Sequence, residues 1–186
     1  MIGVAHLGLA YGASEIALAV ARRSKRVYAS SRDAGTLRAV WTVIAIAVAG
    51  AIWIAHSFAY GHYEPGACVI DVALGLFILG LSLRWWAIVS LGRFFTVDVA
   101  IHVGHELVER GPYRVLRHPS YTGALVAFVG LGLLFDSWPA LVLATLPVLA
   151  VLLVRMRVEE RTLAAHFGEA WLAYESRTWR LVPGLW

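Results

Sequence analysis

The sequence predicts an all-α integral membrane protein with about five transmembrane helices. Of its 186 residues, 60% are hydrophobic and only 15% are charged, whereas soluble domains are close to half apolar and about a quarter charged. The mean hydropathy of +0.70 agrees with this bias. The charged residues are also gathered between long apolar runs, so the composition and its distribution both indicate a protein built for a bilayer.

Five apolar runs account for the predicted helices. They cover residues 2–21, 39–60, 69–89, 121–135 and 139–154. A helix needs about 20 apolar residues to span the hydrocarbon core, with roughly 17 as the lower limit. The first three runs are therefore long enough. The last two are short and lie close together in sequence, which predicts a tightly joined hairpin.

The orientation in the membrane follows from the 16 Lys and Arg residues. Apart from Arg84, they gather after the first, third and fifth runs, with six in 22–38, four in 93–117 and five in 155–180. The connections after the second and fourth runs contain none. Because positively charged loops stay in the cytoplasm, the N-terminus is predicted outside and the polar segments of the second half inside.

The whole chain, residues 1–186, is predicted to form a single membrane domain. Residues 1–90 supply three helices, and residues 91–186 carry the polar motifs. The net charge of +4 is explained by the basic cytoplasmic loops, which we expect to contact anionic membrane lipids. The sequence has no basic patch on a soluble fold and no aromatic stacking platform, so nucleic acid is not an expected partner.

Two polar islands stand among the apolar runs of the second half. The first is residues 111–123, GPYRVLRHPSYTG, in which Pro119 is predicted in the first turn of a helix, where its missing N–H costs nothing. The second is residues 155–161, RMRVEER, which leads into large apolar residues at helical spacing: Leu163, Phe167, Trp171 and Tyr174. This spacing predicts a C-terminal amphipathic helix, interrupted at Gly168, whose aromatic stripe packs against the protein or the membrane interface.

Arg155 and Glu159 are four residues apart, so their side chains share one helix face. The spacing fits an ordinary ion pair, and it equally fits a site in which Glu159 binds an ammonium and Arg155 a carboxylate. His118 is a candidate general base, cofactor contact or helix cap. His102 and His105 lack a third ligand at matching spacing, so no metal site is expected.

The first apolar run carries two ionisable side chains, His6 and Glu15. Such residues are costly inside a bilayer and often line functional cavities. Both lie towards the ends of the run, however, where a side chain can reach the interface. We therefore favour an interfacial position over a cavity for both.

Together the two islands resemble the isoprenylcysteine carboxyl methyltransferase family. The residues that carry the resemblance are Gly111-Pro-Tyr, Arg117-His-Pro-Ser-Tyr and Gly123, then Arg155-x-x-x-Glu-Glu, Leu163, Phe167-Gly, Tyr174, Arg177, Arg180 and Pro183. The chain is also similar, more loosely, to phospholipid N-methyltransferases and to the C-terminal part of integral-membrane sterol reductases. The resemblance extends over residues 91–186.

The resemblance implies that cytoplasmic segments bind S-adenosyl-L-methionine and that a lipophilic acceptor enters from the bilayer. The residues implied to bind the cofactor are His105, Glu106, Leu107, Val108, Tyr113, His118, Pro119, Ser120, Tyr121 and Glu159. Glu159 would pair with the amino group of the cofactor. Arg155 and Arg117 are the implied catalytic residues, and Arg155, with Arg177 or Arg180, would bind an acidic acceptor.

The expected reaction is methyl transfer to a lipophilic small molecule or a prenylated acceptor, at a carboxylate or another acidic oxygen. A carboxylate is already ionised at neutral pH and needs no general base. The alternatives are a phospholipid-type N-methyltransferase, a membrane NADPH-dependent reductase and a non-catalytic lipid-binding scaffold. Such reductases are normally longer, with more helices before the shared region, and a scaffold would bind no cofactor.

Overall fold

The computed structural model describes residues 4–21, 33–58, 60–64, 66–95 and 106–185, and these contain helices but no strand. The elements are α1 (Val4–Ala21), α2 (Asp33–Ser57), α3 (Ala67–Leu91), η1 (Gly92–Phe94), η2 (Gly111–Arg114), α4 (Pro119–Leu133), α5 (Trp138–Phe167) and α6 (Glu169–Glu175). Three segments are long and apolar enough to cross a membrane, namely 35–57, 67–94 and 138–167, and α4 is a shorter apolar helix of 15 residues. The predicted all-α membrane architecture is thus confirmed. The count of five spans stays a prediction.

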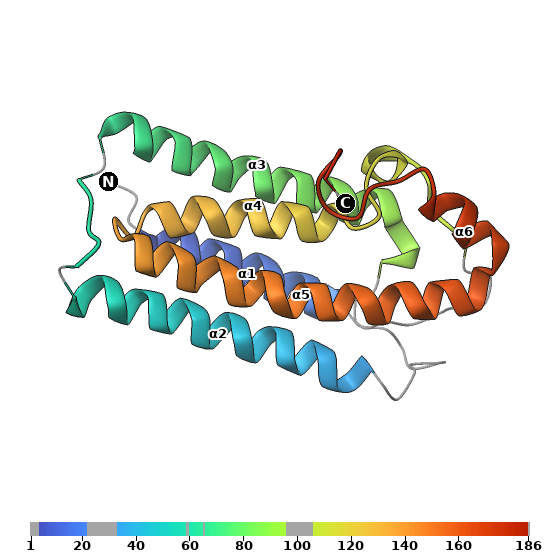
Figure 1. Cartoon of the computed structure of the whole chain (residues 1–186), viewed down its shortest axis with the longest axis horizontal. Coiled ribbons are helices and arrows are strands. Elements are labelled where there is room, and N and C mark those ends of the chain that lie inside the picture. Colours follow the sequence, from blue (N-terminus) through green and yellow to red (C-terminus); the bar gives the residue numbers. More distant parts are fainter. Residues whose placement is uncertain (1–3, 22–32, 59, 65, 96–105, 186) are drawn as a thin grey trace.

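The five longest helices lie side by side in one elongated bundle (Figure 1). α3 packs along α4, α2 packs along α5, and α4 also packs against α5. α4 and α5 are joined by a turn of four residues, 134–137, as the predicted hairpin requires. The α4–α5 turn and the α2–α3 connection lie at one end of the bundle, whereas η2, α6 and the C-terminus lie at the other (Figure 1). Both polar islands therefore meet at the same end.

A seam of small residues holds α3 against α4. A Cβ atom added at Gly123 would lie 2.5 Å from the carbonyl oxygen of Gly80 and 2.6 Å from the backbone nitrogen of Arg84. A Cβ atom added at Gly130 would lie 2.5 Å from the carbonyl oxygen of Ala73. Small residues let helix backbones approach closely in membranes. The seam consequently fixes the first turns of α4 directly beside Arg84.

The helix ends follow the local sequence. Pro119 occupies the first turn of α4, as predicted. Ser137 caps α5, with its hydroxyl accepting a hydrogen bond from the backbone N–H of Ala140 at 3.4 Å. Gly168, with a φ of +55°, separates α5 from α6, which confirms the predicted interruption. α5 is longer than its apolar run because the helix continues through the second polar island to Phe167.

Candidate functional site

The C-terminal segment runs beside the residues that precede α4. The backbone N–H of Arg117 donates to the carbonyl oxygen of Trp179 at 2.7 Å, and that of His118 donates to Arg180 at 3.2 Å. In α6, the buried hydroxyl of Tyr174 donates to the carbonyl oxygen of Tyr113 at 2.9 Å. These bonds bring the first polar island, the helix after the second island and the C-terminus into one unit.

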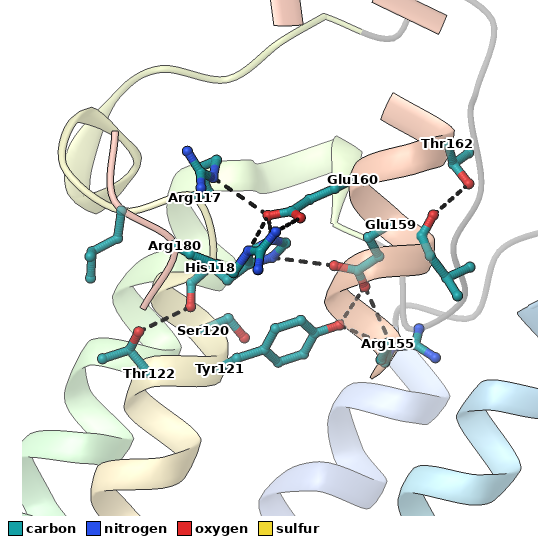
Figure 2. A network of polar contacts seen from close by, with 12 residues as sticks. Arg117, His118, Ser120, Tyr121, Thr122, Arg155, Glu159, Glu160, Thr162 and Arg180 are labelled. Carbon is teal, nitrogen blue, oxygen red and sulfur yellow. Dashed lines mark hydrogen bonds and ion pairs between the residues drawn. The ribbon is translucent and has the colours of Figure 1, made fainter. Parts of the chain in front are cut away.

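Glu160 of α5 gathers three cationic or ionisable side chains at the centre of this unit (Figure 2). Arg180 donates from Nε to Oε1 of Glu160 at 2.9 Å and from Nη2 to Oε2 at 2.5 Å. His118 approaches with Nε2 at 3.1 Å, and Nε of Arg117 lies 3.5 Å from the same carboxylate. Because the Glu160 side chain is only 9% exposed, these groups share a buried carboxylate.

Arg117 is used mainly to close the C-terminal turn. Its Nη1 donates to the carbonyl oxygens of Glu175 at 2.7 Å and Thr178 at 2.8 Å. Its Nε is buried and has no hydrogen-bond partner within the described part of the chain. The Arg117 guanidinium therefore holds the backbone of the C-terminal turn. The Glu160 carboxylate is the negative charge nearest to it.

His118 lies between two carboxylates. Its Nε2 faces Glu160, and its Nδ1 lies 3.5 Å from Oε2 of Glu159. Burial alone would lower the pKa of His118, but the hydrogen bonds and charges of Glu159 and Glu160 outweigh it and raise the pKa above its ordinary value. His118 stands at the N-cap position of α4 without a capping hydrogen bond from its side chain, so the helix-cap interpretation was wrong.

Glu159 forms the second half of the cluster with Tyr121 and Arg155 (Figure 2). The Tyr121 hydroxyl donates to Oε1 of Glu159, and Arg155 Nε donates to the Tyr121 hydroxyl at 3.0 Å. Arg155 Nε also lies 3.4 Å from Oε1 of Glu159, which confirms that this pair shares a helix face. The Glu159 side chain remains 21% exposed, whereas that of Arg155 is 4% exposed. Of the two side chains, the Glu159 carboxylate is the more exposed to solvent.

A cavity of about 80 Å³ lies next to this cluster, among α1, α2, α3, α4 and α5. Apolar side chains from α1 and α2 form part of its wall, including Leu18, Leu37, Val40, Trp41 and Ile44. Arg155, Tyr121, Ser120, Arg84 and Glu15 supply its polar lining. The cavity thus combines an apolar wall with a few polar groups, as small-molecule sites do, and its volume is well below the roughly 300–1,000 Å³ of pockets that enclose a drug-sized ligand.

Sequence reasoning missed one ion pair at this cavity. Glu15 is buried at 5% exposure and pairs with Arg84 of α3, so the predicted interfacial position of Glu15 was wrong. The reason is that Glu15 lies almost two helical turns before the end of α1, and its side chain points towards Arg84. His6, by contrast, is exposed. The presence of one acidic and one basic residue in neighbouring apolar helices was the available signal.

Not all of the predicted site residues come together. Glu106 is exposed, 3.7 Å from Arg93, and Leu107 and Val108 lie in the irregular segment before η2. His105 lies outside the described residues. Arg177 pairs with Glu109 at the surface, where its side chain is 56% exposed. The residues that come together are Arg117, His118, Ser120, Tyr121, Arg155, Glu159, Glu160 and Arg180, with Tyr113 and Pro119 buried beside them. Of these, Ser120, Tyr121 and Arg155 line the cavity.

Comparison with known proteins shows what the chain as a whole is similar to. The family model described as phospholipid methyltransferase matches residues 69–170. Protein-S-isoprenylcysteine O-methyltransferase B of Arabidopsis thaliana is 32% identical over 117 residues, which are 62% of this chain and 59% of the relative. Uncharacterized protein YpbQ of Bacillus subtilis is 31% identical over 80 residues, 43% of this chain and 48% of the relative.

Among solved structures, a eukaryotic intramembrane Ras methyltransferase (isoprenylcysteine carboxyl methyltransferase) aligns with a TM-score of 0.64 and 25% sequence identity. The alignment covers 78% of this chain and 52% of that one. The chain thus spans between about half and three fifths of the length of the relatives it matches.

Proposed function

Because the chain belongs to the phospholipid methyltransferase family, we propose that it is an integral membrane methyltransferase. It transfers a methyl group from S-adenosyl-L-methionine to an acidic oxygen, a carboxylate in the first instance, of a lipophilic small molecule or a prenylated acceptor. The observation that carries this proposal is the pair of Glu159 and Arg155, of which Arg155 lines an apolar cavity. The names of the Arabidopsis relative and of the solved intramembrane methyltransferase support the carboxylate.

The carboxylate oxygens of Glu159 can accept hydrogen bonds from the ammonium group of the cofactor. Glu159 accepts a hydrogen bond from the Tyr121 hydroxyl and has Arg155 and His118 at 3.4 Å and 3.5 Å, and because a carboxylate offers about four acceptor sites it keeps capacity for a further donor. Ser120 and Tyr121 in the first turn of α4, with His118 before it, would surround the rest of the cofactor. When bound, S-adenosyl-L-methionine would supply its sulfonium methyl group: the acceptor oxygen would bond to the methyl carbon as the carbon–sulfur bond breaks, and S-adenosylhomocysteine would leave as a neutral thioether.

Arg155 is the residue we assign to the acceptor. It is held by Tyr121 and by Thr36, whose hydroxyl accepts from Nη1 at 3.2 Å, and it lines the apolar cavity. A guanidinium suits a carboxylate because it offers two parallel donors. An ionised carboxylate has no proton to remove, so the protein's contribution is to orient the acceptor and exclude water. Arg117 and Arg180 then act by holding Glu160 rather than the acceptor.

The membrane topology follows from the same proposal. α1 and α4 would complete five spans with the three longer helices, and α6 would lie beyond the membrane. η2, the last turns of α5 and the segment after α6 carry basic residues and lie at the end of the bundle that carries the polar cluster (Figure 1), so this end would face the cytoplasm. The acceptor would enter from the lipid and the cofactor from the cytoplasm.

The deciding experiment is titration of the detergent-solubilised protein with S-adenosylhomocysteine, followed by turnover of a farnesylcysteine-type carboxylic acid and of phosphatidylethanolamine vesicles. Glu159→Gln should weaken S-adenosylhomocysteine binding by roughly 10- to 100-fold, because an ammonium loses its charged acceptor. Arg155→Ala should leave this binding within about twofold of the wild type and reduce turnover of the carboxylic acid at least about tenfold.

Glu169→Gln, an exposed carboxylate on α6, is the matched control and should change neither quantity. Methylation of phosphatidylethanolamine but not of the carboxylic acid would establish the phospholipid N-methyltransferase reaction instead. Folded wild-type protein that binds neither S-adenosylmethionine nor S-adenosylhomocysteine would refute the proposal.

A further inference from the structure

An ion pair inside the bundle joins the first helix to the third. Nη2 of Arg84 donates to Oε2 of Glu15 at 2.6 Å, and Nε donates to Oε1, so the contact is bidentate. The two side chains are 12% and 6% exposed. Charges buried within membrane-spanning helices are costly to place there and are rarely kept without a role.

Arg84 carries this contact onward to α4. Its Nη1 donates to the hydroxyl of Ser120 at 2.9 Å and to the carbonyl oxygen of the same residue at 3.3 Å. Ser120 is followed directly by Tyr121, whose hydroxyl donates to Glu159. A single guanidinium therefore links a carboxylate of α1 to the turn of α4 from which the cluster around Glu159 is built.

A second contact between the same two helices is available for comparison. One residue away on each helix, Nε1 of Trp85 donates to the hydroxyl of Ser14 at 3.1 Å. That bond is exposed and uncharged and has no link to α4 among the described contacts. If joining α1 to α3 were the only requirement, a contact of this kind would be enough. The buried charges at Glu15 and Arg84 thus require another explanation.

We propose that Glu15 and Arg84 form a positioning pair for the methyl-transfer site, in which Glu15 fixes Arg84 and Arg84 fixes Ser120 and the first turn of α4. The inference rests on the proposed function for the identity of the site. Both residues also line the cavity, so the pair holds the wall contributed by α1 against the cluster. Glu15 lies outside residues 69–170, the part of the chain that the family model matches.

The test uses Glu15→Gln, which keeps the shape of the side chain and removes its charge, with Ser14→Ala as the matched control. Two quantities are measured: the dissociation constant for S-adenosylhomocysteine, and the hydrogen–deuterium exchange of residues 118–124, which requires no ligand. Glu15→Gln should raise the dissociation constant and the exchange rate about tenfold each, because a charged bond that orients the guanidinium is lost. Ser14→Ala should leave both within about twofold of the wild type.

The relay through Arg84 is tested by repeating Glu15→Gln in an Arg84→Met background. If Glu15 acts through Arg84, the second substitution adds no further change in either quantity. Glu15→Gln that lowers only the melting temperature, with exchange at 118–124 unaltered, would make the pair a simple structural clamp and overturn the inference. Should the wild type bind no S-adenosylhomocysteine, the proposed function fails, and the exchange measurement alone decides the positioning role.

Discussion

The substitution Glu160→Gln probes the buried carboxylate at the centre of the cluster. Glu160 receives two hydrogen bonds from Arg180 and one from His118, and it is the nearest counter-charge to Arg117. The Arg117 and Arg180 side chains are only 8% and 16% exposed, so water cannot solvate these two guanidinium groups once the carboxylate charge is removed. Removing one partner of a buried ion pair costs about 3–5 kcal/mol.

Glutamine keeps one acceptor oxygen, so we expect the lower end of this range, about 3 kcal/mol. For a chain of this length each kcal/mol lowers the melting temperature by about 2–4 °C, so the expected shift is about 6–12 °C. The eight tryptophans make intrinsic fluorescence in detergent a suitable readout. Trypsin should also cleave after Arg180 sooner in the variant, because that residue is released from Glu160.

Glu169→Gln, on the exposed face of α6, is the control and should melt within about 2 °C of the wild type. Equal melting temperatures for Glu160→Gln and this control would refute the reasoning. The three cationic neighbours would then contribute no net stability through Glu160, whatever their distances.

Two further outcomes follow from the same structure. Because the pKa of His118 is raised above its ordinary value of 6.5, the protonated ring stabilises the fold below that pH, and this contribution is lost as the pH rises through the raised pKa. The melting temperature should therefore fall between neutral and mildly alkaline pH, and His118→Gln should flatten the profile in that range; an unchanged profile would contradict the assignment. Gly123→Ala should destabilise the protein by at least about 1–3 kcal/mol, because its methyl group would meet the backbone of α3 at 2.5 Å. Gly75→Ala, in the partner helix α3 but with nothing within 4 Å, should be neutral or stabilising by about 0.5–1 kcal/mol, and equal denaturation midpoints for the two variants would remove the seam argument.

Local sequence signals predicted the parts of this fold that depend on neighbouring residues. Arg155 and Glu159 share a face because four residues make about one helical turn. Pro119 begins α4 and Gly168 ends α5, since the first has no N–H to lose and the second adopts a positive φ. The lengths of the apolar runs likewise predicted the helices of the bundle, because each run is a continuous local feature of the sequence.

Contacts between distant segments could not be predicted in this way. Arg180 reaches Glu160 because the C-terminal segment folds back beside η2, and nothing in its local sequence specifies that path. Arg177 was expected at the site, but the turn after α6 directs it to Glu109 at the surface. Glu15 meets Arg84 across 69 residues, and their pairing depends on how α1 is rotated against α3. Register and rotation between helices are set by packing rather than by local propensity.

The length of α5 determines how deep in the membrane the side chains of Arg155 and Glu159 would lie. Trp138, exposed at the start of this helix, suits one membrane–water boundary. At about 1.5 Å per residue, Arg155 lies about 26 Å further along the helix and Glu159 about 32 Å. A hydrocarbon core of about 30 Å would end between them. An acceptor could then keep its tail in lipid while its head group reaches Arg155, and a water-soluble methyl donor could meet it at Glu159 without either molecule crossing the boundary.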